Sequence, residues 1–335
     1  MARQYIPARY VWSWSSLTGS VLGLLEHVGL PADSVLVGCL LGETMRSSGP
    51  PDVAGSAPAT VDDQTELFAP TGYPPRSLVN LIEPLQALGL DATLHERDLS
   101  CERPPRFFTR RLKAVLNAER PLIAYGAGRA VGPSVPPAEF GLIVGYDDER
   151  RAYRVDGPLS AEVDAWLPFD ELGGSPLTAA VDRRWLAVID ASVDEPQPDR
   201  VAALARSAAL DAAGPRGLER WIELLETDLP IDPQGHAWWA QGLAAGRAEA
   251  AQFWGRCARS LPGLTSVADL IQREALTLSR FATLHPYPTG GDSGSAVGRT
   301  LSARTLIEAL ALEREAIDRL AAATVPNSLT LAPPS

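Results

Sequence analysis

Cysteine and histidine are scarce in this sequence. Its 335 residues include three cysteines and four histidines, and both sets are spread widely along the chain. An odd number of distant cysteines predicts neither a disulfide framework nor a zinc site. It fits a protein kept in a reducing environment. The histidines show no metal-ligand spacing, so we expect no bound metal ion.

A phosphate-binding loop is also missing. Gly126, Gly128 and Gly132 follow a predicted strand, but no helix pattern begins there, as a nucleotide-binding loop would require. We therefore expect no nucleotide cofactor, and no motif indicates a cofactor of another kind.

Long apolar runs and an excess of positive charge are absent as well. No stretch reaches the roughly 18 uninterrupted apolar residues of a membrane span. Trp12, Ser13 and Trp14 break up the N-terminal segment, which does not resemble a signal peptide. The formal charge is −11, whereas a nucleic-acid partner requires a cationic surface. We expect a cytoplasmic protein with no membrane or nucleic-acid partner.

The apolar residues that are present indicate two domains. Residues 1–192 predict an α+β domain, with helices first and an antiparallel sheet after them. Its predicted helices are 16–27, 75–88 and 107–120. Its predicted strands are 91–98, at an edge of the sheet, 122–125 and 183–191. A proline-rich linker at 192–200 follows. Residues 201–325 predict a helical domain. Its predicted helices are 217–226, 238–261, 266–284 and 303–323, with a flexible connection at 287–300.

A β-hairpin near the middle of the chain carries the most specific pattern. "FGLIVGY" predicts a strand from Phe140 to Tyr146, "DDER" a turn, and "RAYRVD" a return strand that ends at Asp156. Asp147 and Asp148 suit the turn. Glu139 stands immediately before the first strand.

This hairpin, together with the helix at Ser16 before it, resembles the butirosin-biosynthesis acyltransferase family. "AAGRAEAAQFWGRCARS" and "LIEALALEREAIDRL" are also similar to the C-terminal helical domain of that family. The resemblance implies a papain-like α+β domain followed by an all-helical domain. It also implies a catalytic cysteine at the start of the first helix, which falls on Ser16, a histidine on Glu139, and a third polar residue on Asp156.

These replacements direct the functional hypothesis away from cysteine chemistry, which needs a thiolate and an imidazole. We expect an enzyme of bacterial antibiotic biosynthesis that performs base-assisted chemistry on an amine-bearing small molecule, such as an amine displacement that closes an aziridine-type ring. Glu139 would be the general base, Asp156 would orient it or the amine, and Ser16 would remain as a hydrogen-bonding group.

Four further residues complete the predicted site. Arg46 would hold a departing or resting anion, and Trp12, Trp14 and Tyr125 would form its apolar walls.

Two alternatives stay open. One is an amide-forming acyltransferase that acts through Ser16; Cys39, in the apolar "LVGCLLG", is favoured as a buried cysteine over a relocated nucleophile. The other is a non-catalytic subunit that binds a second protein through its helical domain. Its tryptophans would then be either interface anchors or core residues, namely Trp221, Trp238, Trp239 and Trp254.

Overall fold

A computed structural model gives the fold of the chain. It describes residues 2–30, 32–45, 81–98, 106–125, 127, 139–158, 165–172, 185–193, 198–212, 216–227 and 230–323. Two compact units emerge, one of residues 1–37 and 71–198, the other of residues 38–70 and 199–335. The sequence predicts one domain before the 192–200 linker and one after it. In the structure, each unit instead combines two separate stretches of the sequence.

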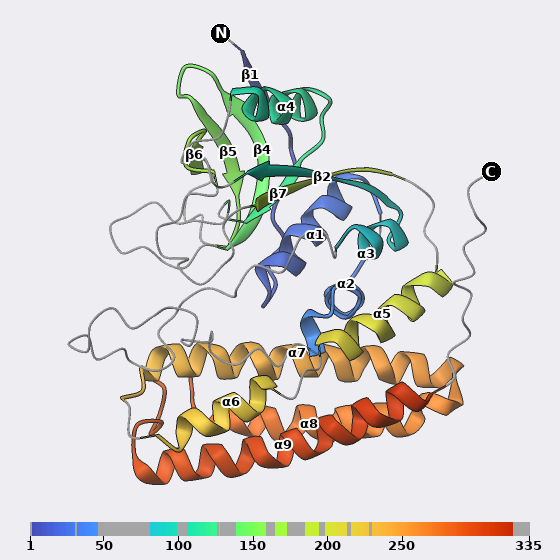
Figure 1. Ribbon diagram of the computed structural model, residues 1–335, viewed down its shortest axis with the longest axis vertical. Helices are drawn as coiled ribbons and strands as arrows, with labels where there is room; N and C mark the ends of the chain where they lie inside the picture. The colour runs from blue at the N-terminus through green and yellow to red at the C-terminus, as the bar shows by residue number, and fades with distance from the viewer. Residues whose placement is uncertain are drawn as a thin grey trace. The chain divides into compact units, whose positions relative to one another are not determined.

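The first unit is built around an antiparallel sheet (Figure 1). Its strand order is β2-β7-β3-β4-β5-β6, and β1 pairs with β4. The strands are β1 (Arg3–Tyr5), β2 (Leu90–Asp98), β3 (Leu122–Tyr125), β4 (Phe140–Asp147), β5 (Ala152–Asp156), β6 (Ala165–Pro168) and β7 (Trp185–Val193). The predicted α+β class, the β4–β5 hairpin and the edge position of the 91–98 strand are confirmed.

The central strands β3 and β4 are buried along their whole length. Near-continuous apolar sequence on these strands, including Leu122, Ile123 and Leu142, is typical of strands that are covered on both faces. Helix α1 (Ser16–His27) packs against β3 and β4, and α4 (Arg106–Asn117) packs against β4 and β1. Helix α3 (Ile82–Ala87) lies on β2.

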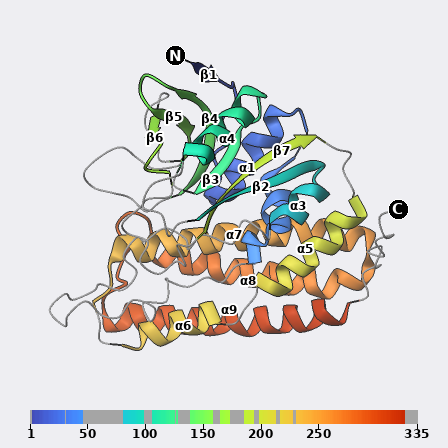
Figure 2. The same ribbon diagram turned by 45° about the horizontal axis from the view of Figure 1, so that its top comes forward.

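Helices make up the described part of the second unit. They are α5 (Pro198–Ala212), α6 (Arg216–Leu225), α7 (Pro233–Ser260), α8 (Thr265–Leu284) and α9 (Ala296–Ala322), with 3₁₀ turns at Glu43–Met45 (η1) and Pro262–Leu264 (η4). Helices α7, α8 and α9 run side by side in both views (Figures 1 and 2). No helix in the described ranges has the length and apolar character needed to cross a membrane.

A cluster of three buried charges crosses the interior of this unit. Arg247 on α7 donates to Glu274 on α8 and Glu313 on α9, each at 2.5 Å, and all three side chains are fully buried. The same guanidinium donates to the carbonyl oxygen of Thr44 in η1 at 2.6 Å. Arg247 therefore ties the 43–45 turn to three helices. Burial, assisted by the Glu313 carboxylate, raises the pKa of Glu274 to about 7.

Aromatic side chains pack together where the start of α7 meets the end of α8. The rings of His236 and His285 lie 4.4 Å apart and contact Phe281, and His236 also contacts Trp221. Burial is the main cause that lowers the pKa of His236, to about 3. Trp221, Trp239 and Trp254 are buried and Trp238 is half-buried, so the first three are core residues of this unit rather than exposed anchors.

Several elements differ from the sequence prediction. Strands β1 and β6 and helices α2 (Ser34–Leu40) and α5 were not expected, and α5 begins inside the predicted 192–200 linker. Helix α7 begins at Pro233, because Asp232 caps it and proline suits the first turn. Helix α9 begins at Ala296, inside the predicted flexible connection, because the Ser295 hydroxyl accepts from the Gly298 N–H.

Candidate functional site

Ser16 lies in the first turn of α1 and is held there by a local cap. The Ser15 hydroxyl accepts a hydrogen bond from the Thr18 N–H at 3.4 Å, and Ser15 has the extended backbone of a capping residue. Gly29, with φ of +76°, follows the helix end in a left-handed conformation that glycine favours. The sequence therefore places the Ser16 side chain at the positive end of a helix dipole.

Glu139 meets Ser16 at this point. The Ser16 hydroxyl donates a short hydrogen bond to Oε2 of Glu139 and accepts one from the Phe140 N–H at 3.2 Å. Both side chains are buried, with 9% of Ser16 and 7% of Glu139 exposed. Glu139 is therefore not a solvated residue at a strand start. Helix α1 and strand β4 together bring a carboxylate and a hydroxyl, 123 residues apart in sequence, into direct contact.

Two tyrosines lie in the electrostatic field of this carboxylate. Burial and then the charge of Glu139 raise the pKa of both Tyr10 and Tyr125 above the ordinary value of a phenol. Tyr125 ends β3, is buried, and packs its ring edge-on against Phe140 at 5.2 Å. Both phenols therefore stay neutral and can act only as hydrogen-bonding groups or aromatic walls.

Tyr10 fits against α1 because residue 19 is glycine. A Cβ at Gly19 would lie 2.4 Å from the Tyr10 hydroxyl and 2.4 Å from the carbonyl oxygen of Val11. The Tyr10 hydroxyl is buried, and the backbone of Ser13 close to it partly opposes the rise in its pKa.

Asp156 holds the segment that carries Tyr10. Its Oδ2 accepts from the Tyr10 N–H at 3.1 Å and lies 3.9 Å from the guanidinium of Arg9. The predicted role of Asp156 was to orient Glu139 or the amine. These two contacts reach residues 9 and 10, so through them Asp156 would act on Glu139 by way of Tyr10.

The remaining predicted residues are less closely tied to this pair. Trp12 is 78% exposed and Trp14 is half-buried. Arg46 lies outside the described residues, so its role as an anion clamp stays a prediction. Cys39 is a buried free cysteine whose sulfur lies 3.1 Å from the Thr44 hydroxyl.

Sequence reasoning missed Tyr10 and Gly19. Glycine three residues into a predicted helix is a signal of close approach, because it is unfavourable there unless something packs on it. The identity of the packing residue could not be inferred, because Tyr10 precedes the helix in a segment without periodicity.

This arrangement can accept and release a proton. A carboxylate fixed by a hydroxyl and flanked by neutral phenols can bind an ammonium group and serve as its base.

Within the described ranges, no group of three or more His, Cys, Asp or Glu side chains is arranged to hold a metal ion. Comparison with known proteins finds no family model that matches this chain and no curated protein whose sequence matches it.

Proposed function

We propose that this protein is an enzyme of bacterial antibiotic biosynthesis in which Glu139 acts as a general base on an amine-bearing small molecule. The observation that carries the proposal is the hydrogen bond from the Ser16 hydroxyl to the Glu139 carboxylate. A general base must be held in a fixed position to be effective. Ser16 provides that restraint from the first turn of a buried helix.

The preference for an amine rests on charge and on the neighbouring rings. A carboxylate attracts an ammonium group, and tyrosine faces attract cations. Burial and the charge of Glu139 raise the pKa of Tyr10 and of Tyr125, so both phenols stay neutral. The net charge of −11 also favours the approach of a cationic substrate, although salt weakens such steering.

The proposed step balances without a cofactor. Glu139 takes a proton from the substrate ammonium, and the freed nitrogen lone pair attacks the neighbouring carbon that bears the leaving group. The N–C bond forms as the bond from carbon to the leaving group breaks, and the leaving group departs as an anion with that electron pair. The products are a cyclic ammonium ion and the anion, and Glu139 returns its proton to water.

The resemblance to the butirosin-biosynthesis acyltransferase family supports the same site. In a papain-like domain, the first helix and the central hairpin carry the catalytic groups. In this chain the first helix begins at Ser16, the hairpin begins next to Glu139, and its return strand ends at Asp156. We propose that the scaffold is papain-like, with a helical C-terminal domain, and that its thiol and imidazole have been exchanged.

Anion release from simple probes tests the reaction class. The probes are aminoethyl bromide, sulfate and phosphate, each compared with the hydroxyethyl compound that bears the same leaving group. We expect the protein to accelerate release from at least one amine and not from its hydroxyl counterpart. Absence of acceleration with every amine, or equal acceleration of the hydroxyl compounds, would overturn the proposal.

The direction of the Ser16 hydrogen bond favours a second candidate, acyl transfer through Ser16. Its hydroxyl proton already points at a carboxylate that could accept it. The test is intact mass spectrometry after incubation with the acetyl thioester of N-acetylcysteamine. An acetyl adduct on the wild type that is missing from Ser16→Ala would support this candidate, and an unmodified wild type would exclude a covalent role for Ser16.

A further inference from the structure

Helix α4 presents two faces of different character. Its buried side carries Phe108, Leu112 and Leu116. Lys113, beside them, bonds to Asp148 and lies 4.2 Å from the centre of the Phe169 ring. Lys113 is therefore committed to the protein's own packing, and its hydrogen bond lowers the pKa of the Asp148 carboxyl.

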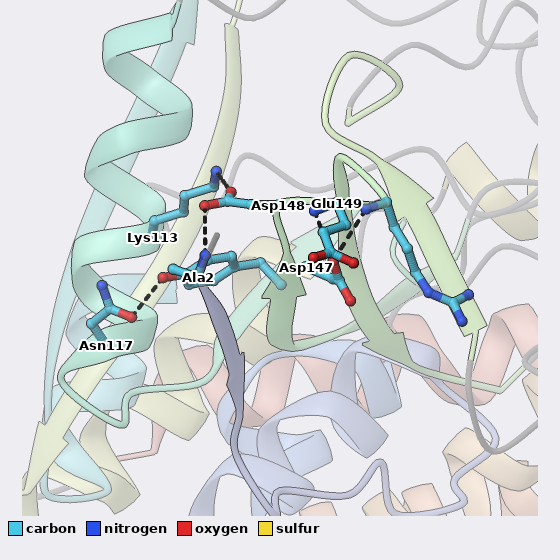
Figure 3. A network of polar contacts seen from close by, with 8 residues as sticks. Ala2, Lys113, Asn117, Asp147, Asp148 and Glu149 are labelled. Atoms are coloured by element: carbon cyan, nitrogen blue, oxygen red, sulfur yellow. Dashed lines mark hydrogen bonds and ion pairs between the residues drawn. The ribbon is translucent and has the colours of Figure 1, made fainter.

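Further polar contacts fix the orientation of this helix. Figure 3 shows Lys113 and Asn117 reaching from α4 toward the start of the chain and the hairpin turn. Asn117 accepts a hydrogen bond from the Tyr146 hydroxyl at 2.9 Å, and Asp148 also accepts one from the Ala2 N–H at 3.3 Å. The opposite face of α4 is therefore held outward.

That outward face combines an aromatic side chain with positive charge. Phe107 is 72% exposed. Arg110, Arg111 and Ala114 are exposed and follow it at the i+3, i+4 and i+7 positions, which share one helix face. Arg106 is exposed beside them. Among the described residues, none of these three arginines has an ion-pair partner.

This composition is unusual for its setting. Helix α4 contains no acidic residue, although the chain as a whole carries a formal charge of −11. An exposed aromatic side chain between arginines that form no ion pair with the described residues is the composition of an interface anchor, since aromatic residues and arginine dominate binding energy at protein interfaces.

We propose that the α4 face formed by Arg106, Phe107, Arg110 and Arg111 docks an acidic helix of a partner protein. Glutamates or aspartates of that helix would pair with the guanidinium groups, and an apolar gap between them would receive Phe107. A single exposed ring provides too little apolar area for stable insertion into a membrane surface, which requires a continuous apolar helix face. Charge complementarity therefore favours an acidic protein surface.

Fluorescence anisotropy with a defined probe tests the proposal. The probe is a fluorescein-labelled helical peptide with glutamates around a leucine stripe. We expect saturable binding that weakens as salt is added, because the ion pairs are exposed. Arg110→Glu/Arg111→Glu and Phe107→Ala should each raise Kd by about tenfold or more.

The matched control is Arg273→Glu/Arg280→Glu, which makes the same charge change at two exposed arginines of α8. This control should bind the peptide about as the wild type does. Three outcomes would overturn the proposal. They are absence of peptide binding, equal weakening by the control pair, and sedimentation with phosphatidylserine-containing vesicles but no peptide binding. Circular dichroism of each variant verifies that the fold is retained.

Discussion

At the scale of single residues, Ser16 and Glu139 define the candidate site, and Tyr10 completes its surroundings. The positions of Ser16 and Glu139 follow from local sequence, because a capped helix begins at one and a hairpin strand begins beside the other. Their contact follows from α1 packing on β4, which local sequence does not specify. The resemblance supplied that pairing as an expectation, and the hydrogen bond between them agrees with it.

Gly19 tests how Tyr10 is positioned. We expect Gly19→Ala to lower the free energy of unfolding by about 1–3 kcal/mol, because the new methyl group would overlap Tyr10 and the Val11 backbone. Chemical denaturation measures this loss.

Gly255→Ala in α7 is the control for Gly19→Ala. A Cβ there meets nothing within 4 Å, so alanine should be neutral or stabilising by up to about 1 kcal/mol. Equal stability of Gly19→Ala and the wild type would show that Tyr10 does not lie against α1.

At the scale of helices and strands, apolar patterns predicted the helices with one buried face and the fully buried strand β3. It predicted β3 with its observed bounds, and α6 and α8 within one or two residues. It missed β1 and β6, which are short, and the true start of α9. The α9 start depends on the Ser295 cap, which a glycine-rich sequence obscures. Short elements gain their stability from neighbours distant in sequence, so their own residues carry little signal.

The Arg247 cluster joins α7, α8 and α9 and makes a pH-dependent contribution to stability. It combines one positive and two negative groups, so protonation of one carboxyl balances its charge. Another buried acidic residue, Glu43 of η1, also belongs to an element that packs on α7. The folded-state pKa of Glu274, about 7, lies above its ordinary value of 4.5. The contribution of protonated Glu274 to the free energy of unfolding is therefore lost as pH rises through about 7.

Glu274→Gln should remove this dependence, because glutamine stays neutral and can still accept from Arg247. We expect the variant to gain about 1–3 kcal/mol relative to the wild type between about pH 5 and about pH 8. Urea unfolding at both pH values measures the difference. Glu315→Gln, at an exposed position of α9, should show no such gain. A constant difference for Glu274→Gln would mean that Glu274 is charged throughout.

At the scale of the whole molecule, the compact units do not follow the order of the chain. A linker rich in proline predicts consecutive domains, whereas residues 38–45 belong with the helices. The bond from Arg247 to the Thr44 carbonyl, across 203 residues, is one physical reason. Local sequence does not encode such a contact, because a buried arginine reads as an ordinary surface residue in a helical pattern.

The stability of the protein should pass through a maximum in mildly acidic solution. His236 is held neutral, with its pKa lowered to about 3, so its unfolded form binds protons more readily and stability falls as pH drops below about 6.5. Burial lowers the pKa of His285 in the same direction. Glu274 acts in the opposite direction, because its contribution to stability falls as pH rises toward about 7. Thermal unfolding across this range measures the profile, and a Tm that rises steadily with acidification would contradict it.

The central claim is that Glu139 removes the proton from the substrate amine. The most direct measurement is the rate of anion release from the accepted aminoethyl probe by wild type, Glu139→Gln and Glu26→Gln, at equal concentrations of folded protein. Glu26, at the exposed end of α1, controls for the loss of one charge. We predict that Glu139→Gln lowers the rate at least about 100-fold, while Glu26→Gln retains it. A Glu139→Gln protein that releases the anion at the wild-type rate would contradict the claim.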